Sequence, residues 1–266
     1  MKKIAVISGT GFYDFFHNDE QVVEDISTPF GNVQIDKLRM NGCWLYHLTR
    51  HGIGHLQLPN HINHRAHISA LHQIGVDLII STSVMGVLDL QIPLGQLVFF
   101  DDLFFPDNRL PDGSICTVHI KPGEPSRGHY IFSSPFSIKA RQIIKEAASL
   151  LQIPYADNKT YAYVNGPRFN SKAECKALRK IQADMISQTA GPEIVLSGEL
   201  GLAYVLMGFG VDYANGVSQT PTPVEDLDKN ISESKNIFCR VIVKALEQMN
   251  SYEGTLFDNG FHYGFK

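Results

Sequence analysis

Short apolar runs alternate along this chain with longer segments in which apolar residues recur at helical spacing. The short runs predict buried strands at Ile4–Ile7, Trp44–Leu48, Leu78–Ser81, Leu97–Phe100, Ala162–Val164 and Tyr204–Gly208. The longer segments predict helices over Ile62–Ile74, Ser137–Leu151, Lys172–Gln182, Glu193–Ala203 and about Asp226–Met249. Strands that alternate with helices pair mostly in parallel and need helices on both faces of the sheet. The alternation therefore predicts an α/β fold, and 266 residues is an ordinary length for one such domain.

The composition and net charge of the chain limit the kinds of molecule that it is expected to bind. Hydrophobic residues make up 44% of the chain and charged residues 19%, which is typical of a soluble globular protein. The formal net charge is −4 and no basic run is present, which argues against a nucleic-acid surface. No apolar run is long enough to span a membrane, and the strand after "MKK" is too short for a signal peptide. We therefore expect a cytoplasmic protein without a nucleic-acid or membrane partner.

The four cysteines are widely scattered and form no C-x-x-C pair. This spacing predicts neither a structural zinc site nor a disulfide framework. The cysteines are Cys43, Cys116, Cys175 and Cys239.

The first predicted strand runs into "SGTGFYD", which resembles the first half of a dinucleotide fingerprint. The third glycine of that fingerprint is replaced by Asp14, whose carboxylate would repel a pyrophosphate. A short loop with backbone N–H groups and the hydroxyls of Ser8 and Thr10 suits a single phosphate better. A plain tight turn after the strand is the alternative.

Histidines and arginines are concentrated in "TRHGIGHLQLPNHINHRAHISAL". A metal site is disfavoured, because Gly52 and Gly54 break the helix that an H-x-x-x-H pair of ligands needs. An anion-binding loop is better supported, since Arg50 offers a fork of donors beside His51 and the glycines let the backbone approach. A solvated polar loop is the alternative.

Two segments with polar or aromatic side chains follow predicted strands. "STSVMGVL", from Ser81 to Leu88, places small residues where ligands bind in open α/β sheets, although a plain turn fits as well. In "NGPRFNS", Phe169 can stack on a flat ring and Asn170 can bind the edge of that ring. Alternatively, Phe169 belongs to the core and Asn170 caps the next helix.

Two further polar segments complete the pattern. In "SQTAGPE", Gln188 and Thr189 precede a helix, where Thr189 can donate to an anion or simply cap the helix. In "VDYANG", Asp212 ends a strand as an acid or as a turn cap. The strand ends together predict one pocket with anion donors and a flat apolar slot.

These segments occur in an order that carries a family resemblance. "SGTGFYD", "RHGIGH", "INHRAHISAL", "SVMGVL", "NGPRFNSKAE", "QTAGPEIVLSGELGLAY" and "VDYANG" follow one another along the chain. With them, the chain resembles the trimeric nucleoside phosphorylases, which include 5′-methylthioadenosine phosphorylase and the 6-oxopurine nucleoside and methylthioinosine phosphorylases. The resemblance spans about residues 4 to 247.

The resemblance implies a fold, an assembly and a reaction. It implies one α/β domain with a central mixed, mostly parallel sheet, and a homotrimer. From the aromatic, glycine-rich sequence after Met249 we expect this domain over residues 1–249 and a C-terminal tail over 250–266. The implied reaction splits a purine nucleoside with inorganic phosphate as co-substrate, without a metal or an organic cofactor.

The resemblance also assigns roles to residues. Thr10, Arg50, His51, Ser83, Val84 and Thr189 would bind phosphate, and Phe169, Asn170, Gln188, Asp212 and Ala214 would bind the nucleoside. Asp212 and His51 become the candidate catalytic residues, with Asp212 facing N7 of the purine.

Three departures from the family pattern bear on the substrate. Gln188 stands where the family commonly has Met, Ala214 replaces the second aspartate of D-x-D, and Asn170 replaces the glutamate of 6-oxopurine enzymes. Because Asp212 remains, methylthioadenosine is the expected substrate, with Val224 and Leu227 as an apolar slot for its 5′ group. A 6-oxopurine or methylthioinosine phosphorylase is the alternative, and an inactive nucleoside- or phosphate-binding regulatory protein is the alternative of another class.

Overall fold

A central nine-stranded sheet organises the computed structural model, which describes residues 1–10, 12, 21–124 and 127–264. Asp14, on which the argument against a dinucleotide partly depends, lies outside these residues. The strand order is β10-β6-β8-β9-β5-β1-β4-β3-β2. Parallel pairings join β1 to β4 and β5, β10 to β5, and β8 to β6 and β9, while the remaining pairings are antiparallel. The predicted mixed, mostly parallel sheet is confirmed.

The elements have the following bounds. The strands of the large sheet are β1 (Lys3–Ser8), β2 (Val22–Thr28), β3 (Gly31–Met40), β4 (Cys43–Thr49), β5 (Leu78–Val87), β6 (Leu97–Phe104), β8 (Tyr155–Tyr163), β9 (Met185–Ser187) and β10 (Ala203–Tyr213). A separate two-stranded ribbon consists of β7 (His129–Phe132) and β11 (Gly260–Tyr263). The α-helices are α1 (His64–Ile74), α2 (Ile138–Leu150), α3 (Lys172–Lys180), α4 (Ala190–Glu199) and α5 (Val224–Asn250).

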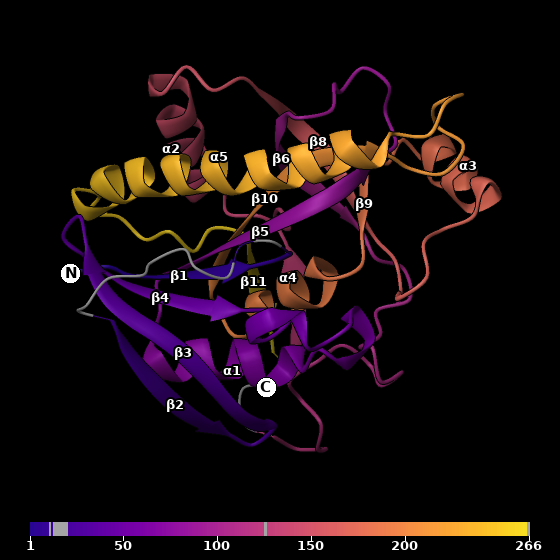
Figure 1. Ribbon diagram of the computed structural model, residues 1–266. Helices are drawn as coiled ribbons and strands as arrows, with labels where there is room; N and C mark the ends of the chain where they lie inside the picture. The colour runs from indigo at the N-terminus through magenta and orange to yellow at the C-terminus, as the bar shows by residue number, and fades with distance from the viewer. Residues whose placement is uncertain (11, 13–20, 125–126, 265–266) are drawn as a thin grey trace.

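Helices cover both faces of the sheet, as the alternation of elements predicts. Figure 1 shows α2 and α5 on one side of the strands and α1 and α4 on the other. Two buried apolar clusters match these layers: one contains residues of α1 and α4, and the other contains residues of α2 and α5. Because burial of apolar surface drives folding, these two clusters fix the sheet between its helices.

The sheet also curls on itself. β10 pairs with β6 on one side and with β5 on the other, so that β5, β10, β6, β8 and β9 close into a barrel-like ring. The register between β10 and β5 shifts between Gly210 and Asp212, as a β-bulge does. A bulge changes the direction of the side chains that follow it, and here that side chain is Asp212.

Two predicted helices have different boundaries in the structure. The helix expected over Glu193–Ala203 is α4, which begins earlier because Pro192 is tolerated in a first helical turn. It ends before Gly201, which has a φ of 68°, and Ala203 already belongs to β10. The helix expected from Ile62 begins after Asn63, whose side chain accepts a hydrogen bond from the Ala66 amide.

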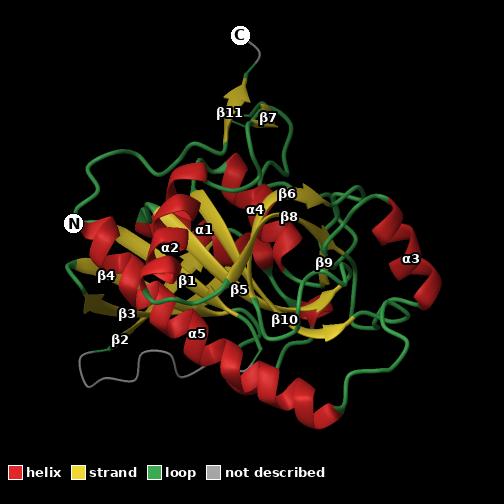
Figure 2. Cartoon of the chain, turned by 90° about the horizontal axis from the view of Figure 1, so that it is seen from above, coloured by secondary structure: helices red, strands yellow, loops and turns green. Residues whose placement is uncertain are grey.

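Five strands are absent from the sequence-based prediction. β2 and β3 form a hairpin with many exposed residues, and β9 has only three residues, so none of them is a long apolar run. β7 and β11 pair antiparallel, which places part of the C-terminal tail on the ribbon that stands away from the large sheet in Figure 2. No helix among the described residues is long and apolar enough to cross a membrane.

Candidate active site

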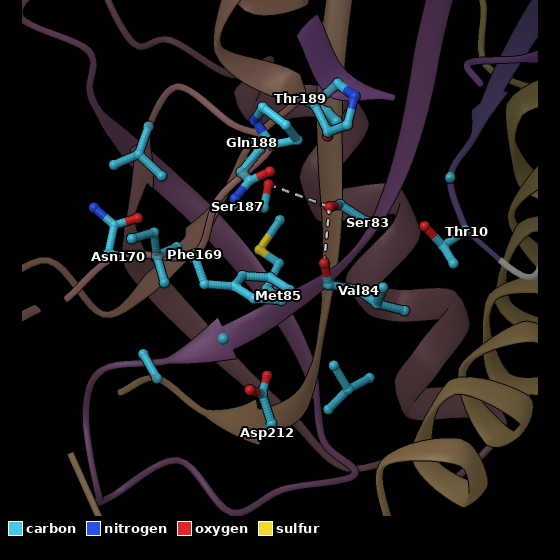
Figure 3. A pocket seen from close by; sticks show the side chains of 18 of the residues that line it. Thr10, Ser83, Val84, Met85, Phe169, Asn170, Ser187, Gln188, Thr189 and Asp212 are labelled. Carbon is cyan, nitrogen blue, oxygen red and sulfur yellow. Dashed lines mark hydrogen bonds between the residues drawn. The ribbon is translucent and has the colours of Figure 1, made fainter. Parts of the chain in front are cut away.

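A cavity of about 400 Å³ lies where several strands of the large sheet end. All eleven site residues expected from the sequence line it: Thr10, Arg50, His51, Ser83, Val84, Phe169, Asn170, Gln188, Thr189, Asp212 and Ala214. In Figure 3, Thr10 lies on one side and Phe169 and Asn170 lie on the other, with Ser83 and Val84 between them. We call Thr10, Arg50, His51, Ser83 and Thr189 the arginine end, and Phe169, Asn170 and Asn215 the loop end. The fold thus brings together segments that are far apart in the sequence.

The arginine end is built around a buried ion pair between Arg50 and Glu193. Nε of Arg50 donates to Oε1 of Glu193 at 2.5 Å, and Nη2 donates to Oε2 at 3.1 Å. Burial alone would raise the pKa of the Glu193 carboxyl, but the Arg50 guanidinium overcomes this effect and lowers that pKa to about 2. Both partners are therefore ionised at neutral pH, and the positive charge of Arg50 already has a counter-ion.

Further hydrogen bonds hold the Arg50 guanidinium in place. Nη2 donates to Ser81 Oγ at 2.5 Å, and Nη1 donates to the Thr82 carbonyl at 3.0 Å. Tyr204 supports the carboxylate, because its hydroxyl donates to Glu193 Oε2 at 2.8 Å. The four bonds from Arg50 use four of its five N–H groups, and Nη1 carries the fifth.

Gly9 leaves room for the Nη1 group of Arg50. A Cβ atom at this position would lie 2.9 Å from Arg50 Nη1 and 3.1 Å from the Thr82 carbonyl oxygen. A larger residue would therefore displace the guanidinium. The neighbouring Ser8 differs from the expectation, since its buried hydroxyl shares a 2.8 Å hydrogen bond with His47 Nε2 instead of facing the cavity.

His51 is a neutral side chain in the folded protein. Burial, reinforced by the nearby charge of Arg50, lowers its pKa to about 4. Its Nδ1 lies 2.8 Å from the Gln57 carbonyl oxygen, which can only accept, so Nδ1 carries the proton. Nε2 of the neutral ring is then a hydrogen-bond acceptor. Because Arg50 and His51 are both buried, the solvated-loop interpretation is wrong for these two residues, although the loop that follows them is largely exposed.

Thr189 and Ser83 supply hydroxyl groups at the arginine end. Thr189 is the N-cap residue of α4 and is buried, yet its side chain makes no capping hydrogen bond. Its hydroxyl is therefore available to a ligand at the helix N-terminus, where the helix dipole favours negative charge. Ser83 Oγ donates weakly to the Val84 carbonyl at 3.2 Å and to Ser187 Oγ at 3.3 Å, as the dashed lines in Figure 3 mark.

Asp212 faces the same cavity from the end of β10 and lies opposite Gln188 and Thr189 in Figure 3. Burial raises the pKa of its carboxyl above the ordinary value. A carboxyl with a raised pKa holds its proton to higher pH, which is the property that a general acid needs.

The loop end is open to solvent. The Phe169 side chain is 84% exposed, so this residue does not belong to the core. Asn170 does not cap α3, because Ser171 is the N-cap residue and forms a capping box with Glu174. Both alternatives to a ligand-binding role are therefore wrong for these two residues.

Apolar side chains of α5 complete the wall. Leu227 and Ile231 line the cavity. Val224, expected beside Leu227, is 71% exposed and does not line it. Among the described residues, no three His, Cys, Asp or Glu side chains gather so that they could hold a metal ion.

Sequence reasoning assigned no role to Glu193 or to two histidines near it, of which His64 is buried and His67 is half-buried. His64 Nδ1 lies 3.9 Å from Glu193 Oε1, and burial lowers the pKa of His64 to about 3. Burial also lowers the pKa of His67 to about 4. The signal for Glu193 is one carboxylate within the otherwise apolar "AGPEIVLSG", which needs a buried partner.

The family follows from comparison with known proteins. The sequence profile of the phosphorylase superfamily matches residues 3–247. A probable 6-oxopurine nucleoside phosphorylase of Dictyoglomus turgidum is 33% identical over 93% of this chain and 94% of its own length. The 6-oxopurine nucleoside phosphorylase of Pyrococcus furiosus is 31% identical over 92% of each chain. The S-methyl-5′-thioadenosine phosphorylase of the same organism is 28% identical over 94% of this chain and 93% of its own.

Solved structures support the same fold. A methylthioadenosine phosphorylase from Schistosoma mansoni, in complex with adenine, superposes with a TM-score of 0.85 at 24% identity and covers 95% of this chain and 93% of its own. The chain belongs to the phosphorylase superfamily. Within it, the chain is an enzyme of the purine nucleoside phosphorylase family.

Proposed function

We propose that the protein cleaves the N-glycosidic bond of 5′-methylthioadenosine with inorganic phosphate, giving adenine and 5-methylthioribose 1-phosphate. One observation carries the proposal: a half-buried acid, Asp212, and the anion donors of the arginine end line the same cavity. A phosphate oxygen attacks C1′, the C1′–N9 bond breaks, and its electron pair leaves with the purine. Asp212 then supplies the proton that the purine takes up at N7.

The arginine end suits a phosphate that is held by hydrogen bonds rather than by excess charge. Arg50 is the only Lys or Arg among the described residues that line the cavity, and Glu193 neutralises it. Thr10, Ser83 and Thr189 offer hydroxyl groups, and the N-terminus of α4 adds its dipole. His51, as an acceptor, suits a protonated phosphate oxygen. A phosphate held against C1′ stabilises the positive charge that develops on the sugar.

Asp212 favours a 6-amino purine over a 6-oxo purine. The N7 edge of adenine presents an acceptor at N7 and a donor at N6, whereas that of a 6-oxo purine presents two acceptors. A protonated carboxyl can donate to N7 and accept from N6–H at the same time. Ala214 has no polar side-chain group that could donate a hydrogen bond to the second acceptor, O6, of a 6-oxo purine. The apolar Leu227 and Ile231 suit a methylthio group at the other end of the nucleoside.

A second candidate is a 6-oxopurine nucleoside, either with a 5′-hydroxyl or with a 5′-methylthio group. It is supported by the 6-oxopurine nucleoside phosphorylases named above, which are 31% and 33% identical to this chain. The identity of the methylthioadenosine phosphorylase is 28%, so sequence similarity favours this candidate slightly.

The deciding experiment is phosphorolysis followed by liquid chromatography of the released base. Methylthioadenosine, adenosine, methylthioinosine and inosine are compared with and without phosphate. Phosphate-dependent release of adenine, fastest from methylthioadenosine, is the expected result. Faster turnover of inosine or methylthioinosine establishes the second candidate, and binding without turnover of any of the four supports a regulatory protein.

Asp212→Asn tests the acid. The amide cannot supply a proton, so kcat for methylthioadenosine is expected to fall by about 10²- to 10⁴-fold with a smaller change in KM. Because the amide N–H₂ can donate to O6, inosine should lose less activity than methylthioadenosine. In the unmodified protein, kcat should decrease as the pH rises through the raised pKa of Asp212. Wild-type kcat in the variant removes Asp212 from the reaction.

The assembly and the domain limits stay predictions. We propose a homotrimer, whose mass in static light scattering is three times the 29.7 kDa of the chain. A monomer at the concentrations of the assay contradicts it. We also keep the division into a phosphorylase domain over residues 1–249 and a tail over 250–266.

A further inference from the structure

The segment between β8 and α3, residues 164–171, carries Phe169 and Asn170 of the loop end. Its most prominent side chain, Phe169, is 84% exposed. The backbone on both sides of Phe169 is nevertheless fixed by side chains from other parts of the chain. The ring can therefore move while its attachment point is held.

Gln188 fixes the backbone before Phe169. Its Nε2 donates to the carbonyl oxygen of Arg168 at 2.8 Å, although the two residues are 20 positions apart. The amide also lies against Gly166, where a Cβ atom would overlap Gln188 Oε1. Gln188 thus reaches across from the junction of β9 and α4 and ties down the loop.

Asn215 fixes the backbone after Phe169. Its Nδ2 donates to the carbonyl oxygen of Asn170 at 2.7 Å, across 45 positions of sequence. Asn215 follows β10, the strand that carries Asp212, and it lines the cavity. The two carbonyl groups that accept these bonds belong to the residues immediately before and after Phe169.

A third attachment joins the loop to α3. The Arg168 guanidinium donates to both carboxylate oxygens of Glu174, at 2.9 and 2.8 Å. Glu174 also accepts from the Ser171 amide at 2.7 Å. These bonds link the loop to its own neighbouring helix, whereas Gln188 and Asn215 link it to the cavity wall.

We propose that Gln188 and Asn215 are positioning residues. They hold the backbone on both sides of Phe169 so that its ring can stack on a flat heterocycle, and they thereby set the affinity for the purine base. The proposal rests on the proposed function for the nature of the ligand. A loop already held in place loses less conformational freedom when a base binds, so affinity increases without any direct contact from either amide. Gln188 thereby has a role besides the ribose contact that the family resemblance implies.

Free adenine separates the two roles of Gln188, because it has no ribose. Calorimetric titration with adenine in the presence of phosphate is made on the wild type, Gln188→Met, Asn215→Ala and the double variant. Each single variant removes one hydrogen bond to the loop, so its Kd for adenine is expected to rise about three- to tenfold. The phosphate KM should remain at the wild-type value. Gln142→Met is the control, since it removes an exposed amide bond to Glu146 on α2, away from the cavity.

Hydrogen exchange gives a readout that does not need turnover. The amides of residues 168–171 should exchange faster in Gln188→Met and Asn215→Ala, while those of α4 stay unchanged. Unchanged exchange together with unchanged adenine affinity overturns the proposal. If adenine affinity is retained but the nucleoside KM rises, Gln188 acts on the ribose alone and the proposal is wrong for Gln188. Asn215 is exposed, so Asn215→Ala keeps the test valid if Gln188→Met does not fold.

The outcome is separable from that of the proposed function. Suppose that the wild type binds adenine but cleaves no nucleoside, and that the Gln188→Met and Asn215→Ala variants bind adenine more weakly. This result would support the positioning role and reject the phosphorylase activity. If the protein cleaves nucleosides and neither substitution changes the turnover or the Kd for adenine, the phosphorylase activity is supported and the positioning role is rejected.

Discussion

Two arginine–glutamate pairs stand at the two ends of the cavity and have opposite surroundings. Arg50 and Glu193 are 1% and 0% exposed, whereas the side chains of Arg168 and Glu174 are 69% and 40% exposed. Both pairs are bidentate. The buried pair fixes a charge inside the core, where each partner depends on the other. Water screens the exposed pair, so it can only fasten a loop to a helix.

The residues around the two ion pairs differ in burial in the same way as the pairs themselves. At the arginine end, strands and helices of the core supply Ser81, Tyr204 and Glu193, all buried. At the loop end, single hydrogen bonds from Gln188 and Asn215 hold an exposed segment. We infer that the arginine end is preformed as part of folding, while the loop end can be adjusted by substitution without loss of the fold.

Glu193→Ala should have the largest effect on stability. It leaves the Arg50 guanidinium buried without a counter-ion, which typically destabilises a protein by about 3–5 kcal/mol. Urea unfolding measures this change, and the phosphate KM should rise in the fraction that stays folded. Wild-type stability in the variant would contradict the inference that the buried Arg50–Glu193 pair contributes more to stability than the exposed Arg168–Glu174 pair.

The lowered pKa values of His64 and His67 predict that the protein loses stability in mild acid. The pKa of His64 is about 3 in the folded protein against 6.5 for an unperturbed histidine, so the folded state binds fewer protons below pH 6.5. The contribution of this group is complete above that pH and is lost as the pH falls toward 3. His64→Phe should reduce the slope of unfolding free energy against pH by up to about 1.4 kcal/mol per pH unit.

The histidine effect can be separated from that of Glu193. The pKa of Glu193 is lowered from 4.5 to about 2, so its contribution is lost only below pH 4.5. Urea unfolding between about pH 6.5 and pH 5 therefore reports the histidines. His51 and His67 remain in the variant and keep part of the slope, because the pKa of each is about 4. An unchanged slope in His64→Phe contradicts the neutral, buried state of this ring.

Thr189→Val should affect the phosphate and little else. The substitution keeps the shape and removes a hydroxyl that makes no capping bond, so the phosphate KM is expected to rise about fivefold for one lost hydrogen bond. Thr189→Ser retains the hydroxyl and serves as the matched control. A fall in thermal stability with an unchanged phosphate KM would assign this hydroxyl to the structure instead of the ligand.

Arg168→Gln should have the smallest effect. It removes the exposed ion pair but leaves the Arg168 carbonyl, which Gln188 binds. We expect no resolvable change in the midpoint of thermal unfolding, and a smaller change in adenine affinity than in Gln188→Met. A larger change than in Gln188→Met would mean that the exposed pair, and not the two amides, holds the loop.

Much of the site could be predicted from the sequence because its residues follow strands. The carboxyl ends of parallel strands meet at one edge of a sheet, so polar residues just after β1 and β4 and in the C-terminal halves of β5 and β10 had to lie near one another. Thr10, Arg50, Ser83 and Asp212 all line the cavity for this reason. Their chemical roles rest on the resemblance and on the experiments described above.

Glu193 and the loop clamps could not be predicted in the same way. Periodicity assigned Glu193 to a helix, but its partner Arg50 is 143 positions away. Likewise, β7 and β11 pair across more than a hundred residues, and neither is a distinct apolar run. Local sequence carries no information about which distant partner a side chain will meet.

The sequence by itself determined the alternation of strands and helices, the α/β class and the order of the polar segments, because these depend on local periodicity and on spacing. Tertiary structure alone decided which groups keep their charge. Burial makes His51 neutral and raises the pKa of Asp212, while the Arg50 guanidinium keeps Glu193 ionised against the effect of burial. Each of these shifts depends on the distance to a charged partner or on the exclusion of water, and both exist only once the chain has folded.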